Sequence, residues 1–300
     1  MNTLLTGGTG FVGRELIKRM KNVSITSRDQ QRAEKNFGSQ VDEVIHWRTA
    51  DEPLLLPKNH SFQSVVNLMG DPIAEGRWTK DKKKRIRDSR VLGTHKLVDA
   101  LLQAGQLPEV LVSASAIGIY GDAGDDLCEE DHPHGQCFLT DVCAQWENEA
   151  MQLQTHGVRV VCLRIGIVLG ADGGALKEMT PLFRRCMGGR LGNGKQWMSW
   201  IHVSDLASLI QWSIQNQSIS GPVNATAPNP ARNEEFTKIL ASAVGRPAFL
   251  SVPKFALRLV LGEFAESLLY SQRVVPAVAL ANGFQFEFTD LANAIKDTVV

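Results

Sequence analysis

The sequence predicts an α/β fold built on a doubly wound parallel sheet. The chain opens with a strand-like run, Asn2 to Leu5, which leads through a glycine-rich turn into a helix-like run. Short apolar runs then alternate with helix-like stretches, a pattern typical of buried parallel strands joined by helices. We therefore expect a Rossmann-type sheet with a smaller C-terminal substrate lobe, and a ligand at the carboxyl ends of the strands.

The glycine-rich turn reads Thr6-Gly7-Gly8-Thr9-Gly10-Phe11-Val12-Gly13. Gly7 or its neighbour allows the tight turn, Gly10 lets the backbone approach a pyrophosphate, and Gly13 lets the helix pack closely on the strand. The helix that starts at Phe11 and Val12 then directs its free N–H groups and its positive dipole end toward the phosphates. Because the turn joins a first strand to a first helix, it predicts a dinucleotide site rather than an ordinary glycine turn.

The second strand-like run ends at Ser27 and Arg28, where a dinucleotide-binding protein contacts the adenosine ribose. An NAD protein usually has Asp or Glu there, which holds the ribose 2′-hydroxyl. Arg28, with the Ser27 hydroxyl beside it and Arg32 one helical turn later, suits a 2′-phosphate instead. Asp29 is the acidic alternative, but its position also suits the N-cap of a helix that begins at Gln30. The sequence therefore predicts NADP rather than NAD.

Composition and charge exclude several classes of protein. The 300 residues are 43% hydrophobic and 21% charged, and the formal net charge is zero, so nothing global indicates a nucleic-acid or membrane partner. No apolar run is long enough to span a bilayer, and the first strand begins too early to leave room for a signal peptide. Five cysteines, an odd number, favour reduced thiols and a cytoplasmic location. The dense charge run from Lys80 to Arg90 is read as a solvated helix face, with a nucleic-acid patch as the alternative.

The remaining elements and the domain boundaries follow from the same periodicity. Strand-like runs lie near 41–47, 64–69, 110–115, 158–163 and 223–225, and helix-like stretches cover 79–103, 138–156 and 204–215. We expect an NADP-binding domain of residues 1–166, to which 200–226 return, and a substrate-side lobe of 167–199 and 227–300. In that lobe Asn233 is expected to cap a helix that Gly245 ends.

Several segments resemble the extended short-chain dehydrogenase/reductase family, in its nucleotide-sugar epimerase and dehydratase branch. Besides the glycine-rich turn, they are Asn67-Leu68-Met69-Gly70, Ser113-Ala114-Ser115, Ile119-Tyr120-Gly121, Arg164-Ile165-Gly166-Ile167-Val168 and Trp200-Ile201-His202-Val203-Ser204-Asp205. The resemblance implies that Leu68 and Met69 lie under the adenosine half of the cofactor and Val168 beside the nicotinamide. It also implies a homodimer paired through helices 79–103 and 138–156.

A narrower resemblance is to atypical members of the group called "epimerase family" proteins. It rests on Arg77-Trp78-Thr79 through Ser89-Arg90, on Gly173-Gly174-Ala175-Leu176, on Gly194-Lys195-Gln196-Trp197 and on the tail from Gly262 to Asp297. Those members end in a C-terminal domain of unknown function, which the tail from about Ser251 resembles.

The chain lacks the acid–base pair on which the family's chemistry depends. The family uses a tyrosine and a lysine four residues later, but the two tyrosines here, Tyr120 and Tyr270, are followed at that spacing by Gly124 and Val274. The family's asparagine in Asn-Val-x-Gly-Thr is also replaced, here by Arg90. The standard mechanism therefore cannot be transferred to this chain.

Ser115 and Tyr120 remain as catalytic candidates, on the condition that a cation lowers the pKa of Tyr120. Arg90 is a candidate for that cation, and the alternative is that it binds the cofactor phosphates. When Glu147 is aligned with the family's trailing glutamate, Cys143 falls at the lysine position, although a cysteine on an apolar helix face is usually inert. A further candidate pair, His202 and Asp205, mainly packs the lobes together in the wider family.

Two other patterns resemble known binding motifs without matching them. Four potential zinc ligands cluster in one acidic loop: Cys128, His132, His134 and Cys137. Their spacing is unfamiliar, so we expect no metal and a substrate-facing or plain surface loop. The run from Gly189 to Lys195 opens like a phosphate-binding loop, but Gln196 stands where Ser or Thr should hold magnesium, so contact with an anion or substrate fits better.

Three functions fit these observations. The first is an NADP(H)-dependent oxidoreductase or nucleotide-sugar-epimerase-like enzyme that acts on an unidentified small molecule. The second is a non-catalytic NADP(H)-binding sensor or interaction protein, which the missing tyrosine–lysine pair favours. The third is a regulatory protein whose C-terminal helices bind a partner. The tryptophans and glycines between Gly188 and Trp200 favour a shaped pocket, so we expect an enzyme.

Overall fold

A computed structural model describes residues 1–57, 61–105 and 107–299. Its centre is a seven-stranded sheet in the order β12-β7-β5-β4-β1-β2-β3, in which every neighbouring pair is parallel. The strands are β1 (Thr3–Thr6), β2 (Val23–Ser27), β3 (Glu43–His46), β4 (Ser64–Asn67), β5 (Val110–Ala116), β7 (Arg159–Ile165) and β12 (Gly221–Ala225). The predicted α/β fold with a doubly wound parallel sheet is confirmed.

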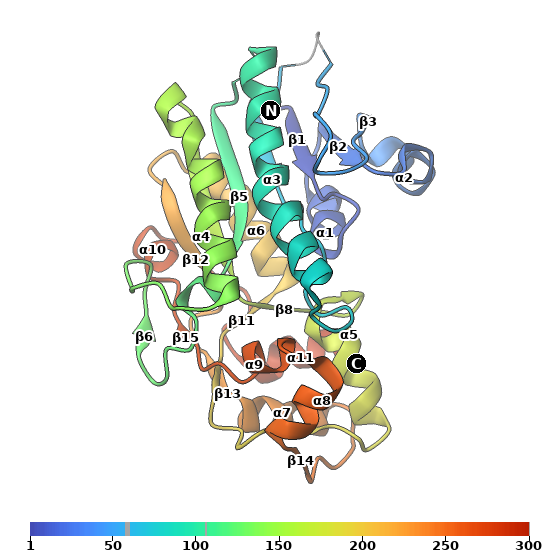
Figure 1. The fold of residues 1–300 in the computed structure, drawn as a ribbon, viewed down its shortest axis with the longest axis vertical. Coiled ribbons are helices and arrows are strands. Elements are labelled where there is room, and N and C mark those ends of the chain that lie inside the picture. The colour runs from blue at the N-terminus through green and yellow to red at the C-terminus, as the bar shows by residue number, and fades with distance from the viewer. Residues whose placement is uncertain (58–60, 106, 300) are drawn as a thin grey trace.

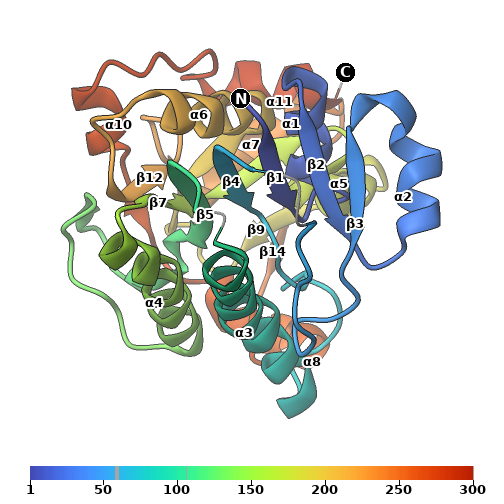
Figure 2. The same ribbon diagram turned by 90° about the horizontal axis from the view of Figure 1, so that it is seen from above.

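Helices cover both faces of this sheet, as Figures 1 and 2 show. One face carries α3 (Lys80–Ala104) and α4 (Phe138–Met151), and the other carries α1 (Phe11–Arg19) and α6 (Val203–Gln215), with α2 (Gln30–Phe37) beside β3. Successive strand residues point to opposite faces, so Leu4 packs in the apolar cluster under α3 and Leu5 in the cluster under α1 and α6. Both faces are buried, which explains why the strands read as unbroken apolar runs.

Most of the remaining elements form a second group below the carboxyl edge of the sheet in Figure 1. They are β6 (Leu127–Cys128), β8 (Ile167–Gly170), α5 (Gly174–Arg184), β9 (Gly189–Leu191), β10 (Trp197–Met198), β11 (Trp200–His202), β13 (Ala231–Arg232), α7 (Asn233–Ala243), β14 (Leu250–Val252), α8 (Lys254–Leu261), α9 (Phe264–Ser267), β15 (Arg273–Val274) and α11 (Leu291–Val299). The remaining helix, α10 (Ala277–Ala281), lies beside β12 and packs in the apolar cluster of the sheet. Part of the second group has an apolar cluster of its own, around Trp200, Phe236 and Ile295. That it acts as a substrate-side lobe stays a prediction. None of the helices in the described ranges combines the length and apolar character needed to cross a bilayer.

The two predicted helix caps have different outcomes. Asp29 does cap α2, because its Oδ1 accepts a hydrogen bond from the Arg32 N–H at 3.0 Å. The prediction that Asn233 caps α7 is wrong, since Arg232 holds the N-cap position and Asn233 is the first helical residue. The buried Asn233 side chain instead accepts a hydrogen bond from the Leu191 N–H at 2.8 Å, which ties α7 to β9.

Three glycines form a socket for the Phe11 ring at the start of α1. A Cβ atom added at Gly173 would lie 2.4 Å from the ring, one at Gly170 2.5 Å, and one at Gly174 3.2 Å. Gly173 has extended backbone with φ of −178°, so space alone requires a glycine there. The socket joins the glycine-rich turn to the connection between β8 and α5.

Gly173→Ala should therefore destabilise the protein through a clash with Phe11. We expect a loss of about 1–3 kcal/mol in the free energy of unfolding, measured by urea denaturation. In a Phe11→Ala background the same substitution should cost less than about 0.5 kcal/mol, because the clashing ring is gone. An equal cost in both backgrounds would contradict the socket.

Candidate functional site

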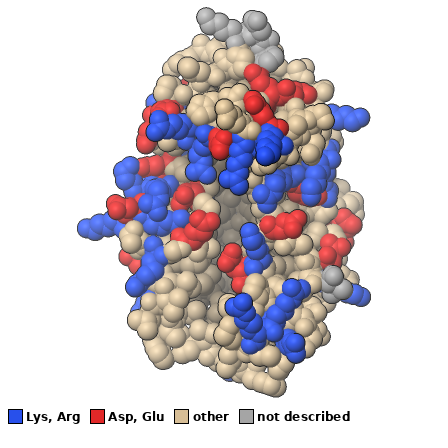
Figure 3. Space-filling view, turned by 90° about the vertical axis from the view of Figure 1, so that its right-hand side faces the viewer, with Lys and Arg blue, Asp and Glu red and all other residues tan. Residues whose placement is uncertain are grey.

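The carboxyl edge of the sheet is where the buried strands become accessible. The interiors of β1, β4 and β5 are buried, whereas Leu68 just after β4, Ala116 at the end of β5 and Ile165 at the end of β7 are half-buried. Figure 3 shows a recess near the centre of one face, with Lys and Arg side chains on both of its sides and Asp and Glu among them.

The glycine-rich turn packs tightly enough that side chains would not fit. Gly7 has φ of +72°, and a Cβ there would lie 2.5 Å from the Leu68 carbonyl oxygen, so the turn rests against the exit of β4. A Cβ at Gly13 would lie 2.5 Å from the Gly7 carbonyl oxygen. The N-cap of α1 is Gly10, with no side-chain cap and no acidic residue in the first turn. The first N–H groups of α1, including those of Phe11 and Val12, are therefore available to an anion.

At the end of β2, Arg28 and the neighbouring Asp29 have different surroundings. The Ser27 hydroxyl donates to the Asp29 carbonyl oxygen at 2.9 Å and accepts from the Asp29 N–H at 3.2 Å, so it shapes the local turn. The Asp29 carboxylate is engaged in capping α2, whereas Arg28 is exposed. The strand end thus presents a guanidinium, with its neighbouring carboxylate held by a helix.

The other predicted cofactor residues are spread along the same edge. A Cβ at Gly93 of α3 would lie 2.1 Å from Met69 Cε, so the Met69 side chain extends into α3 rather than over the edge. Val168 on β8 is half-buried against the sheet's apolar cluster. Arg90 on α3 lies beside Gly70, with its Cζ only 2.9 Å from the place of a Gly70 Cβ.

The two catalytic candidates, Ser115 and Tyr120, lie in a buried network around an ion pair. Arg164 Nε and Nη2 donate to the two carboxylate oxygens of Glu147, each at 3.0 Å. The Ser115 hydroxyl donates to Glu147 Oε1 at 2.6 Å, and Arg164 Nη1 donates to the Tyr120 hydroxyl at 3.0 Å. The Tyr120 hydroxyl in turn donates to Asn224 Oδ1 at 2.6 Å. Each of the two candidates is only 2% exposed, and both hydroxyls are engaged by protein groups.

The condition placed on Tyr120 is not met. The cation beside Tyr120 is Arg164, not Arg90. Burial raises the pKa of Tyr120 to about 12, even though Arg164 opposes that rise. Burial also raises the pKa of Tyr270. A higher pKa makes the phenolate scarcer near neutral pH, so neither tyrosine resembles the activated tyrosine of the family.

A second buried polar network was not predicted from the sequence. Asn67 at the end of β4 accepts from the Thr6 hydroxyl at 2.7 Å, and it donates to Thr94 at 2.8 Å and to Ser113 at 3.2 Å. It joins β1, β4 and β5 to α3 below the edge. An amide at the end of an apolar strand is the signal that could have identified it, because a buried amide needs several partners.

The four potential zinc ligands have separate surroundings. Cys137 is the N-cap of α4, and its sulfur accepts from the Thr140 N–H at 3.4 Å. Cys128 is fully buried, and burial raises its pKa to about 11. His132 packs against the Tyr120 ring, and His134 Nε2 lies 3.5 Å from Arg164. Within the described ranges, no group of three or more His, Cys, Asp or Glu side chains is placed to hold a metal ion.

His202 and Asp205 hold the C-terminal segment against α6. The buried Asp205 carboxylate accepts from the Glu287 and Phe288 N–H groups, at 2.8 and 2.9 Å. The His202 ring stacks on Phe288 with 3.9 Å between centroids, and its Nδ1 accepts from the Ser204 N–H. His202 Nε2 is 3.3 Å from Asp297, although the two are not aligned for a hydrogen bond. This pair joins parts of the molecule rather than forming a catalytic dyad.

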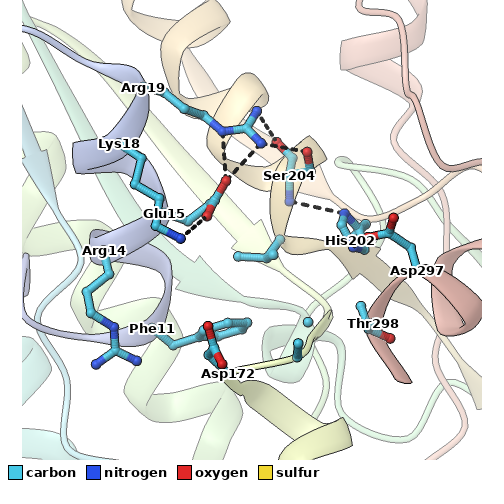
Figure 4. A pocket seen from close by; sticks show the side chains of 13 residues that line it. Phe11, Arg14, Glu15, Lys18, Arg19, Asp172, His202, Ser204, Asp297 and Thr298 are labelled. Atoms are coloured by element: carbon cyan, nitrogen blue, oxygen red, sulfur yellow. Dashed lines mark hydrogen bonds and ion pairs between the residues drawn. The ribbon is translucent and has the colours of Figure 1, made fainter. Parts of the chain in front are cut away.

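A pocket of ≈ 300 Å³ opens beside these residues, between α1, β8 and the end of α11. Figure 4 shows Arg19 bound to Glu15 and Ser204 on one side, and His202 next to Asp297 on the other. Among the described residues that line this pocket, Phe11 is the one that was also predicted to contact the cofactor. The pocket therefore lies apart from the glycine-rich turn's phosphate-facing side.

Glu147→Gln should destabilise the protein strongly, because it leaves the buried Arg164 charge without its carboxylate. We expect a loss of about 3–5 kcal/mol in the free energy of unfolding in urea. Glu149→Gln is the matched control two positions along α4, where a partly exposed carboxylate contacts His95, and it should cost less than about 1 kcal/mol. Similar small losses in the two variants would show that the ion pair is not structural.

Stability should fall at mildly acidic pH because of His202. Burial lowers its pKa below the ordinary value, against the opposing charges of Asp297, Asp205, Glu287 and Glu15. The folded state therefore disfavours the imidazolium, and the stability that the neutral ring provides is present above the unfolded pKa and is lost as pH falls through the folded one. Thermal unfolding between roughly pH 7.5 and 5 should show this loss. His202→Asn, which keeps an acceptor for the Ser204 N–H, should reduce the slope of stability against pH. An unchanged slope would show that other groups cause the loss of stability.

Comparisons with known proteins agree over the whole chain. The NAD dependent epimerase/dehydratase family matches residues 3–225, and a domain of unknown function, DUF1731, matches residues 252–298. A chloroplastic epimerase family protein SDR39U1 homolog from Arabidopsis thaliana is 40% identical, covering 99% of this chain and 86% of its own. Epimerase family protein YfhF of Bacillus subtilis is 34% identical, covering 100% and 98%.

A solved structure is similar throughout. The human epimerase family protein SDR39U1, crystallised with NADPH, is 32% identical and superposes with a TM-score of 0.88, covering 100% of this chain and 99% of its own. The similarity thus covers the sheet and the C-terminal segment together. This chain belongs to the NAD dependent epimerase/dehydratase family, as an atypical extended short-chain dehydrogenase/reductase that ends in a DUF1731 domain.

Proposed function

We propose that this protein binds NADP(H) along the carboxyl edge of its sheet, with the 2′-phosphate at the end of β2. One observation carries the proposal: the exposed Arg28 guanidinium stands where an NAD protein needs a free acid, while the adjacent Asp29 carboxylate is engaged in capping α2. The human relative crystallised with NADPH supports this cofactor. The cations beside the recess of Figure 3 suit a ligand with several phosphates.

The residues present suit the two phosphate-bearing parts of the cofactor best, at the start of α1 and at the end of β2. The uncapped start of α1 provides N–H groups for the pyrophosphate, and Gly7, Gly10 and Gly13 present no side chain there. Bound there, the nicotinamide would supply hydride-transfer chemistry. The proposed contacts are Gly7, Gly10, Phe11, Val12 and Gly13 for the pyrophosphate, Ser27 and Arg28 for the 2′-phosphate, Leu68 and Met69 for the adenosine, and Val168 for the nicotinamide side.

For the reaction, we favour an oxidoreductase or epimerase-like enzyme that acts on a small molecule where β5 and β7 end. Its proton donor would not be a tyrosine activated by a lysine, because the chain has no such pair. The burial of Ser115 and Tyr120 favours the second candidate, a protein that binds NADP(H) without turning it over. Incubating the NADPH complex with a panel of carbonyl compounds and nucleotide sugars separates the two, because only an enzyme consumes the cofactor. The family resemblance also suggests a homodimer that pairs through α3 and α4, and we keep this as a proposal.

Arg28→Ala should weaken NADPH binding much more than NADH binding. Losing a charge-assisted contact with the 2′-phosphate is worth about 1.5–3 kcal/mol, or roughly 10- to 150-fold in the NADPH dissociation constant. The NADH constant should change by less than about threefold, since NADH has no 2′-phosphate. Titration followed by nicotinamide fluorescence measures both.

Lys35→Ala is the control, because it removes one exposed positive charge from the last turn of α2, the helix that begins just after Arg28. It should leave both constants near the wild-type values. Equal weakening of NADPH and NADH by Arg28→Ala would overturn the assignment of the 2′-phosphate.

A further inference from the structure

The lysine that the family carries on α4 has no cationic replacement on that helix. In the alignment by Glu147, Cys143 holds its position, and the side chain is 3% exposed. A Cβ at Gly118 would lie 3.9 Å from its sulfur, so Cys143 faces the turn after β5. Burial raises the pKa of Cys143 to about 12, which keeps the thiol neutral. The cation must therefore come from elsewhere if the site has one.

A guanidinium from α3 lies next to this position. Arg90 Cζ is 5.3 Å from the centre of the Trp146 ring on α4, and the Arg90 charge interacts electrostatically with Cys143 and Asp71. Its Nη1 donates to the carbonyl oxygens of Asp71 and Ile86, at 3.0 and 3.1 Å. These contacts hold the side chain between the exit of β4 and the inner side of α4.

The rest of this guanidinium has no partner in the described part of the chain. No carboxylate lies within 4.0 Å of it there, and its Nε and Nη2 make no hydrogen bond to a described residue. A half-buried cation that lacks an anion is costly, and a ligand that supplies oxygen acceptors would remove that cost. Two of the three nitrogens of Arg90 are thus available to a bound molecule.

The sheet order tells which half of the cofactor Arg90 would meet. β2 and β4 flank β1 on opposite sides, so the glycine-rich turn lies between the ends of these two strands. Arg28 follows β2, and the proposed adenosine contacts Leu68 and Met69 directly follow β4. Arg90 reaches past them to Trp146 of α4, which packs on β5, the strand that lies beyond β4 from β1 and β2. With the 2′-phosphate at Arg28, Arg90 lies on the far side of the pyrophosphate, toward the nicotinamide nucleoside.

We propose that Arg90 binds the nicotinamide half of NADP(H), so that the cation which the family carries on α4 comes here from α3. The inference rests on the proposed function. A guanidinium can donate hydrogen bonds to ribose hydroxyls or to the adjoining phosphate, but it does not release a proton near neutral pH. Arg90 therefore holds and orients the cofactor, and it is not the missing proton donor.

Dissecting the ligand tests this assignment directly. NADPH and 2′,5′-ADP, which is the adenosine half with its 2′-phosphate, are titrated against the wild type, Arg90→Met, Arg90→Lys and Arg28→Ala by calorimetry. Arg90→Met should weaken NADPH binding by at least about tenfold and change 2′,5′-ADP binding by less than about twofold. Arg28→Ala should weaken both ligands, and Arg90→Lys, which keeps the charge, should weaken NADPH less than Arg90→Met does.

The outcomes separate this inference from the proposed function. Retained 2′,5′-ADP binding shows that Arg90→Met is folded with an intact adenosine site. Equal weakening of both ligands by Arg90→Met, or no weakening of either, would overturn the assignment to the nicotinamide half while NADP(H) binding stands. A wild type that binds neither ligand would overturn the proposed function, and this inference with it.

Discussion

The ion pair between Arg164 and Glu147 is the interaction around which the centre of the molecule is organised. Arg164 on β7 is 3% exposed, so both charges have lost most of their hydration. Such a pair is stable only when its remaining hydrogen-bonding capacity is also satisfied. Burial lowers the pKa of Arg164, but the hydrogen bonds and charge of Glu147 outweigh burial and raise it. The surrounding groups follow from that requirement.

The pair explains why the candidate catalytic hydroxyls are occupied. Ser115 donates to Glu147, Tyr120 accepts from Arg164, and Arg164 also donates to the Glu130 carbonyl oxygen at 2.8 Å. The Glu130 carboxylate in turn accepts from the Asn224 N–H at 2.9 Å, which ties the loop after β6 to β12. This network joins three strands, β5, β7 and β12, to α4 and to the loop after β6. In the proposed function, the cofactor contacts lie on the accessible edge above this network.

The features that could be predicted from the sequence are those that residues close together in the chain determine. The β2 end was predictable because the N-cap role of Asp29 is set within four residues, and the parallel strands were predictable because burial on both faces leaves continuous apolar runs. Asn233 was misassigned because a tertiary contact, with the Leu191 N–H, takes the side chain that would otherwise cap α7. Local preference gave no sign of that partner.

The partners of Arg164 and Asn67 could not be predicted from the sequence for a similar reason. Tyr120 and Asn224 are 104 positions apart, and Asn67 and Ser113 are 46 apart, so only the folded sheet brings them together. The same holds for Arg90, whose neighbours Gly70 and Trp146 belong to different elements. The sequence identified Tyr120 and Arg90 as candidates, but their roles depend on which partners the fold supplies.

Hydrogen exchange with and without NADPH tests the central claim most directly, that the cofactor lies on the edge and not in the buried network. Saturating NADPH should slow amide exchange in peptides that cover residues 6–13 and 27–32. Peptides that cover 115–120 and 159–165 should exchange slowly in both states, because the network already protects them. Protection by NADPH confined to the network peptides, with none in the glycine-rich turn, would contradict the account.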